Sequence, residues 1–154
     1  MPDDLLKAVE MVWQEGDPDD ILLHKLHRIV NKYRHLLSQK PMDSEVNKLS
    51  LDVRDAQGEL LGGAIVRVHE DWLEISLLAL EKGVRGCGLG RRMMIMIEEK
   101  ARELNCKKIR TETCEINLGF FGKLGYKIGG KLEDLPPGII YFWLIKKILI
   151  EKNL

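Results

Sequence analysis

The sequence predicts an α/β protein in which helices cover both faces of a mixed β-sheet. The apolar, leucine-rich run from Leu73 to Leu80 is typical of a buried strand. A glycine-rich loop follows it, and apolar residues after Gly90 recur at three- and four-residue spacing, as in an amphipathic helix packed on a sheet. Hairpin-type strands precede this unit and strand–helix–strand units continue it, so parallel and antiparallel pairing should occur in one sheet.

The N-terminal third is predicted to hold one long helix. Asp17-Pro18-Asp19-Asp20 is a typical helix start, with an aspartate as N-cap, proline in the first turn and acidic groups at the positive end of the dipole. Leu6 to Trp13, ahead of it, fits a first strand, although its polar residues also permit a helical turn. The helical stripe that ends before Pro41 consists of Leu22, Leu26, Ile29, Val30, Tyr33 and Leu37.

Three strands are expected next, the first two as a hairpin. Leu49 to Arg54 and Leu60 to Val68 are joined by Asp55-Ala56-Gln57-Gly58, a sequence that favours a tight turn. Glu70 and Asp71 form the following turn, which leads into the central strand from Leu73 to Leu80.

The rest of the chain alternates helices and strands. A helix starts near Gly88 to Gly90 and is closed by Asn105. Its apolar stripe consists of Met93, Met94, Ile97, Ala101 and Leu104. The elements predicted after it are a strand over Lys108 to Thr113, a short helix over Asn117 to Lys123, a strand over Tyr126 to Lys131 and a last strand over Ile139 to Ile148.

Length and composition fit a single domain over residues 1–154, with 45% hydrophobic residues. The formal net charge is zero, which favours neither a nucleic acid nor an anionic membrane as partner. The apolar runs Ile75 to Leu80 and Ile139 to Ile145 are too short to span a bilayer. Cys87, Cys106 and Cys114 lack metal-ligand spacing, so no metal site is expected. Together with the acidic start of the chain, they predict a cytoplasmic protein.

The run Arg85-Gly86-Cys87-Gly88-Leu89-Gly90 predicts an anion site. It joins a strand to the N-terminus of a helix, where the first N–H groups have no intrahelical acceptor and the dipole concentrates positive charge. Glycine lets a ligand approach the backbone closely, so a pyrophosphate fits this place. Arg91 and Arg92 are unfavourable at this end of a helix unless an anion is present.

Three other interpretations compete with a pyrophosphate loop. A Walker A loop ends in Gly-Lys-Ser or Gly-Lys-Thr, which Gly90-Arg91-Arg92 does not supply. A dinucleotide fingerprint needs G-x-G-x-x-G, whereas Gly86, Gly88 and Gly90 give G-x-G-x-G. The third is a tight strand-to-helix turn without a ligand, which an isolated pair of glycines would favour.

The chain resembles the GNAT superfamily of N-acetyltransferases, in its small single-domain bacterial form. Arg85 to Gly90 resembles the Q/R-x-x-G-x-G/A loop that binds the acetyl-CoA pyrophosphate. Leu77-Leu78-Ala79-Leu80 is similar to the fourth strand of that fold, and Phe120 to Tyr126 to its F-Y-x-K-x-G-F segment. Pro137-Gly138, followed by an apolar run, is similar to the final hairpin. The resemblance covers roughly Leu51 to Lys147.

The resemblance implies a mixed sheet of about six to seven strands, acetyl-CoA as co-substrate and no metal. In the family the fourth and fifth strands splay apart, and the pantetheine arm pairs with the exposed backbone of the fourth. The residues expected to bind the cofactor are Leu78, Ala79, Leu80, Arg85, Gly86, Cys87, Gly88, Leu89, Gly90, Arg91, Asn117 and Phe121. Asn117 is also compatible with a plain N-cap of the short helix.

Direct attack of an amine on a thioester needs a neutral amine, a donor for the oxyanion and stabilisation of the leaving thiolate. The expected oxyanion donor is a backbone N–H near Leu78. Alternation along the strand puts Glu74 and Ser76 on the face of Leu78, so Glu74 is the first candidate base, acting through a water that Ser76 could hold. Solvation or an arginine partner explains Glu74 equally well. Glu112, on the adjacent strand, is the second candidate.

The chain departs from the family at the general acid. Phe121 stands where the usual tyrosine is expected, and phenylalanine cannot donate a proton. Either the thiolate leaves without a dedicated acid, or Tyr126, Tyr141 or Cys114 compensates, or transfer is slow or absent. Tyr126 aligns with a family position that is usually core, and a buried cysteine such as Cys114 is more often a small hydrophobic residue.

The function predicted from these residues is transfer of the acetyl group of acetyl-CoA to a primary amine of a small molecule or peptide, by direct attack. The alternative is a catalytically impaired acyl-CoA-binding or sensor protein, for which Phe121 is the main argument. A third interpretation, an interaction module with an empty loop, is disfavoured by the glycine–arginine constellation. No nucleic acid or membrane is expected as partner, and a homodimer is compatible with the sequence.

Overall fold

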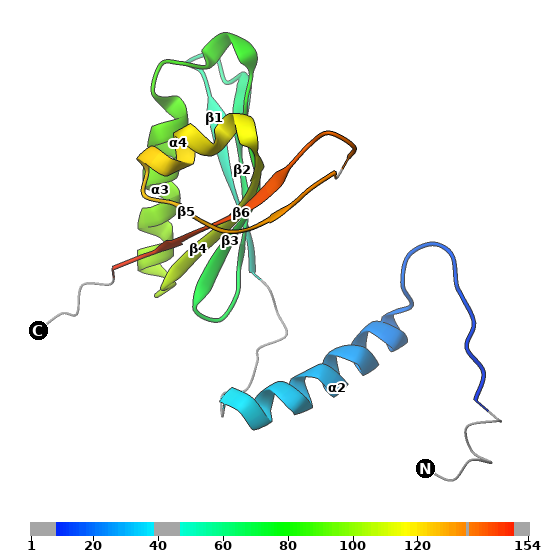
Figure 1. The fold of residues 1–154 in the computed structure, drawn as a ribbon. Coiled ribbons are helices and arrows are strands. Elements are labelled where there is room, and N and C mark those ends of the chain that lie inside the picture. The colour runs from blue at the N-terminus through cyan, green and yellow to red at the C-terminus, as the bar shows by residue number, and fades with distance from the viewer. Residues whose placement is uncertain (1–8, 39–46, 135, 150–154) are drawn as a thin grey trace, which may run out of the picture. The chain divides into compact units, whose positions relative to one another are not determined.

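The computed structural model describes residues 9–38, 47–134 and 136–149 (Figure 1). The chain divides into two units, Met1–Ser44 and Glu45–Leu154, and each is described by itself. The expected single domain over residues 1–154 stays a prediction.

The first unit holds α2 (Asp20–Ser38). An aspartate caps this helix, as expected: the backbone N–H of Ile21 donates to Asp19 Oδ1 at 3.0 Å. Pro18 therefore precedes the cap instead of lying in the first turn. The predicted first strand is wrong for residues 9–13, which have no regular secondary structure, and its earlier residues lie outside the described part.

The second unit is built on a six-stranded mixed sheet, which confirms the predicted fold class (Figure 1). Within the described residues of this unit, β3 and β4 pair in parallel and every other neighbouring pair is antiparallel. The strand order is β1-β2-β3-β4-β6-β5. The strands are β1 (Asn47–Arg54), β2 (Leu60–Val68), β3 (Trp72–Leu80), β4 (Lys108–Cys114), β5 (Lys127–Leu132) and β6 (Tyr141–Lys147).

The β1–β2 hairpin has the predicted turn. Asp55 Oδ1 accepts hydrogen bonds from the backbone N–H groups of Gln57 and Glu59, both at 2.9 Å. Gly58 has a φ of +85°, in the left-handed region that side chains other than glycine rarely adopt. The turn chemistry read from Asp55 and Gly58 therefore fixes the register of this hairpin.

Two helices of the second unit, α3 (Leu89–Glu103) and α4 (Leu118–Lys123), bury side chains in one core. α3 starts and ends as predicted, since Gly88 is its N-cap and Asn105, with a φ of +57°, lies just beyond its end. Short 3₁₀ turns span Lys82–Val84 and Glu115–Asn117. The core comprises Ala64, Val66, Leu73, Ile75, Met93, Met94, Ile97, Ala101, Cys106, Ile109, Phe121, Tyr126, Leu144 and Ile148. The expected helical cover of the second sheet face stays a prediction.

A β-bulge in β3 changes which side chains face this core. Val66 of β2 lies opposite Ile75, and its neighbour Ile65 lies opposite Leu77, so Ser76 is an extra residue. Before the bulge Ile75 is buried in the core, and after it Leu78 packs against the same core. The prediction that Glu74 and Leu78 share a face is therefore wrong, because the extra residue reverses the alternation.

Candidate functional site

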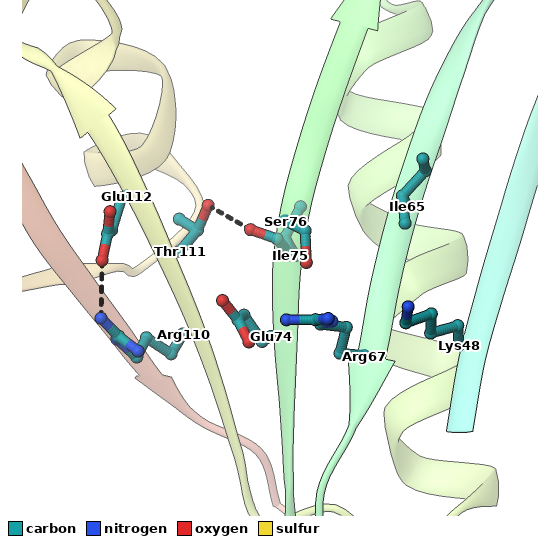
Figure 2. Close-up of a pocket in the computed structure, with 9 residues that line it drawn as sticks. All are labelled: Lys48, Ile65, Arg67, Glu74, Ile75, Ser76, Arg110, Thr111 and Glu112. Carbon is teal, nitrogen blue, oxygen red and sulfur yellow. Dashed lines mark hydrogen bonds and ion pairs between the residues drawn. The ribbon is translucent and has the colours of Figure 1, made fainter. Parts of the chain in front are cut away.

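Two cavities meet where β3 and β4 separate. The parallel pairing of these strands ends at Ile75 and Thr111, and Thr111 Oγ1 donates a hydrogen bond to the carbonyl oxygen of Ile75 at 3.2 Å. Figure 2 shows the two strands diverging beyond this contact. Both cavities are lined by Ile75, Ser76, Thr111 and Glu112. The two cavities thus share lining residues at the point where the strands separate.

The larger cavity, of about 700 Å³, lies between the end of β3, the glycine-rich loop and α4. The structure brings ten of the expected cofactor residues to its lining: Leu78, Ala79, Leu80, Arg85, Gly86, Gly88, Gly90, Arg91, Asn117 and Phe121. Cys87 and Leu89, from the same predicted set, are not among its lining residues. Residues of the strand motif, the glycine-rich loop and the α4 segment therefore line one cavity.

The glycine-rich loop has the backbone that close approach of an anion requires. Gly86 and Gly88 have φ values of +78° and +86°, and a Cβ atom on either would meet no atom within 4 Å. Gly88 is the N-cap of α3 and has no side chain with which to cap it, so this residue supplies no acceptor for the first N–H groups of the helix. Arg85 is held beside the cavity, since its Nε donates to the carbonyl oxygen of Leu80 at 3.0 Å.

The edge of β3 that faces the gap can be assigned from its hydrogen bonds. The N–H of Glu81 donates to the carbonyl oxygen of Leu61 on the β2 side, at 2.8 Å. Backbone groups alternate between the two edges of a strand, so the N–H and carbonyl groups of Leu78 and Leu80 point toward the gap. The bond from Arg85 to Leu80 agrees with this direction.

Asn117 and Phe121 form the α4 side of the larger cavity. Asn117 Nδ2 donates to Thr113 Oγ1 at 3.1 Å. Asn117 occupies the N-cap position of α4, but its side chain makes no capping bond, so the plain N-cap interpretation does not account for it. Phe121 is 5% exposed, and its ring packs edge-on against the rings of Phe120 and Tyr126.

The three side chains considered as substitutes for the missing phenol lie elsewhere. Neither Cys114, Tyr126 nor Tyr141 lines either cavity. The Tyr126 hydroxyl is buried in the core, and its burial and the nearby carboxylate of Glu98 raise the pKa of Tyr126. Glu98 is itself paired with Lys146 at 2.8 Å. These contacts indicate a structural part for Tyr126.

The smaller cavity, of about 410 Å³, contains both candidate bases. Glu74 Oε2 lies 3.2 Å from His69 Nε2, and the His69 ring stacks on Trp72. Glu112 Oε1 accepts hydrogen bonds from Arg110 at 2.6 Å and from Trp143 Nε1 at 2.7 Å. Glu112 is thus held by two donors and lines both cavities, whereas Glu74 lines the smaller one alone.

Within residues 9–38, 47–134 and 136–149, no three His, Cys, Asp or Glu side chains gather as metal ligands. Cys87 and Cys114 are partly or fully exposed, Cys106 is buried, and all are free thiols. In the same described ranges, every helix is too short or too polar to cross a membrane.

Comparison with known proteins agrees with this geometry. Residues 13–126 match the model of the Acetyltransferase (GNAT) family. The blasticidin-S acetyltransferase of Streptomyces morookaense is 37% identical over 94 residues, which cover 60% of this chain and 69% of the relative. An acetyltransferase of Agrobacterium fabrum is 26% identical over 106 residues, 68% of this chain and 77% of the relative.

The fold is also that of a solved acetyltransferase from Bacillus cereus, with a TM-score of 0.73 and 24% identity. The superposition covers 88% of this chain and 97% of the other. The family match extends over well more than half of the residues and includes the glycine-rich loop and both strands that border the gap. The chain therefore belongs to the GNAT family of acetyltransferases.

Proposed function

We propose that this protein transfers the acetyl group of acetyl-CoA to a primary amine by direct attack. The observation that carries the proposal is the junction of the two cavities at the point where β3 and β4 part. One cavity offers an anion site at a helix N-terminus and an open strand edge, and the other offers carboxylates. A thioester and an amine entering from opposite sides would meet at this junction.

In this proposal the backbone holds most of the cofactor. The pyrophosphate accepts hydrogen bonds from the first N–H groups of α3, with Arg85 and Arg91 beside it. The pantetheine arm pairs with the gap-facing edge at Leu78 and Leu80 as an added strand, and Asn117 lies across from it. The thioester then lies near the bulge in β3.

The chemistry needs an oxyanion donor and a proton acceptor at the same junction. The N–H of Leu78 points into the gap and serves as the donor, whatever face its side chain occupies. Glu74, through a water bound near Ser76, accepts the proton of the ammonium group. Glu112 is the second candidate base, although Arg110 and Trp143 already bind its carboxylate.

A small-molecule amine is the proposed acceptor, with a peptide amine as the second class, and the setting is the cytoplasm. The smaller cavity is open to the face of the sheet opposite the core. One relative's name states that it acts on blasticidin S, which makes that amine one reasonable probe. The free cysteines fit a reducing compartment.

The decisive experiment incubates purified protein with acetyl-CoA and panels of polyamines, aminoglycosides, blasticidin S, amino acids and peptides. Release of free CoA thiol is followed for each amine, and the acetylated product is identified by mass spectrometry. We expect amine-dependent thiol release. Tight binding of acetyl-CoA without turnover on any amine would favour the sensor alternative instead.

Cys87 provides a direct test of the cofactor loop. Its thiol is exposed, and Sγ donates to the carbonyl oxygen of Val84 at 3.0 Å. CoA bound at this loop should shield Cys87, so labelling by a thiol reagent should slow several-fold when CoA is added. Cys114 serves as the internal reference in a mass-resolved assay. Equal rates for Cys87 with and without CoA would place the cofactor elsewhere.

Phe121→Tyr tests whether departure of the thiolate limits turnover. A phenol at this position would line the larger cavity, so it could donate a proton that the wild-type protein lacks. We expect unchanged affinity for acetyl-CoA and a kcat at least equal to that of the wild type. Tyr126→Phe is the matched control, because this variant removes a buried phenol that lines neither cavity and should leave kcat unchanged. A large loss of kcat in Tyr126→Phe would make Tyr126 the acid.

A further inference from the structure

The smaller cavity has more positive than negative side chains. Its lining includes three cations, Lys48, Arg67 and Arg110, and two carboxylates, Glu74 and Glu112. Arg110 is bound to Glu112 at 2.6 Å. Among the described residues, no carboxylate lies within ion-pair distance of Lys48 or Arg67. Two cations therefore line the cavity without an ion pair to a described carboxylate.

The backbone register places these cations in one row. Lys48 lies directly opposite Arg67, Arg67 opposite Glu74, and Glu74 opposite Arg110, across four neighbouring strands. Figure 2 shows the four side chains at one level of the sheet. All four lie on the face opposite the core, because their strand neighbours, such as Val66 and Ile109, are the ones buried in it.

Attraction between opposite charges on neighbouring strands explains only part of this row of four side chains. Arg67 beside Glu74, and Glu74 beside Arg110, are opposite charges, which stabilise neighbouring strands. Lys48 beside Arg67 is a like-charge pair, which destabilises them. An anion placed between Lys48 and Arg67 would reduce this repulsion.

The strands that carry Lys48 and Arg67 determine how far these two side chains lie from the expected acetyl group. Neighbouring strands lie about 4.8 Å apart, so Arg67 and Lys48 stand one and two strand spacings from β3, or about 5 to 10 Å. The amine must reach the junction at Ser76 and Glu112, which line both cavities. A ligand that spans both places therefore has an amine and an anionic group separated by several bonds.

We propose that the acceptor is an amine that also carries an anionic group, bound by Arg67 and Lys48. This inference rests on the proposed acetyl transfer, and it adds a class of substrate to it. Carboxylate and phosphate share the required chemistry, since both accept charge-assisted hydrogen bonds from guanidinium and ammonium groups. Arg67, with its planar fork of donors, is the main anchor, and Lys48 contributes charge.

The test measures binding of matched probes to the CoA-saturated protein by calorimetry. The probes are 6-aminohexanoate, 6-aminohexyl phosphate and the neutral 6-aminohexan-1-ol. The anionic probes should bind about ten- to a hundredfold more tightly than the alcohol. Arg67→Gln should abolish this preference and Lys48→Gln should reduce it. Arg54→Gln, an arginine of the same sheet outside the cavity, should retain it.

Equal affinity for the acids and the alcohol would overturn the proposal, as would no binding of any probe or an unchanged preference in Arg67→Gln. Preference for only one of the two acids would support the proposal and identify the anion. CoA affinity, measured on every variant, reports on the cofactor site. Failure of the wild type to bind CoA or to transfer acetyl would refute the proposed function. The preference for anionic probes over the alcohol would then be measured without CoA.

Discussion

Gly88→Val should abolish binding of CoA while the protein remains folded. Gly88 lines the larger cavity with a φ of +86°, and its neighbourhood is open, so a β-branched side chain would project into space that the ligand is expected to occupy. Loss of two charge-assisted hydrogen bonds from the loop to pyrophosphate would cost about 3 to 6 kcal/mol, or two or more orders of magnitude in Kd. Calorimetric titration with CoA measures this loss.

The matched control is Gly58→Val. Gly58 has a nearly identical φ of +85° and equally open surroundings, but it lies in the β1–β2 turn, away from both cavities. Both variants should lose about 1 to 3 kcal/mol of stability from backbone strain, and only Gly88→Val should lose CoA. Unchanged CoA affinity in a folded Gly88→Val variant would remove the loop from the cofactor site.

The elements that could be predicted from sequence are those set by local chemistry. The glycines before α3 and the apolar spacing within it specify a helix from a few consecutive turns, and its observed bounds, Leu89–Glu103, agree. The turn at Asp55 and Gly58 likewise fixes a hairpin from four residues. These features depend on neighbours in the sequence, so they can be predicted without the tertiary structure.

Some partners of the candidate bases are near them in the sequence, and one is distant. Glu112 is bound by Trp143, which lies 31 residues away, and their pairing follows from the order of β4 and β6 in the sheet. His69 lies near Glu74 across the short turn before β3. Strand order and register come from packing of the whole sheet, and nothing in the sequence around Glu112 specifies Trp143 as its partner.

The bulge at Ser76 is the point at which strict alternation fails. A run of apolar and small side chains does not reveal an extra residue, so strict alternation predicts that Glu74 and Leu78 share one face. The bulge also lies at the last pair between β3 and β4, where the strands begin to separate. Its position beside both cavities agrees with the tendency of bulges to lie next to functional sites.

Glu74→Gln should lower kcat/KM by about a hundred- to ten-thousandfold at neutral pH, the usual contribution of a general base. A primary amine of the lysine type has a pKa of about 10.4, so below that pH the acceptor is mostly an ammonium ion. A protein without the base reacts only with the small fraction of amine that is already neutral. The kcat/KM of the variant should therefore rise about tenfold per pH unit toward that pKa, and its deficit should be largest at low pH. Thiol release measured across pH gives both values.

The glutamates of the chain allow this effect to be assigned. Glu99→Gln, on the exposed surface of α3, is the matched control and should retain wild-type kcat/KM. Glu112→Gln should have a smaller effect than Glu74→Gln, because Arg110 and Trp143 already hold the Glu112 carboxylate in hydrogen bonds. A wild-type pH profile in Glu74→Gln would contradict its part as base. A deficit that appears in Glu112→Gln alone would transfer that part to Glu112, whose side chain reaches both cavities.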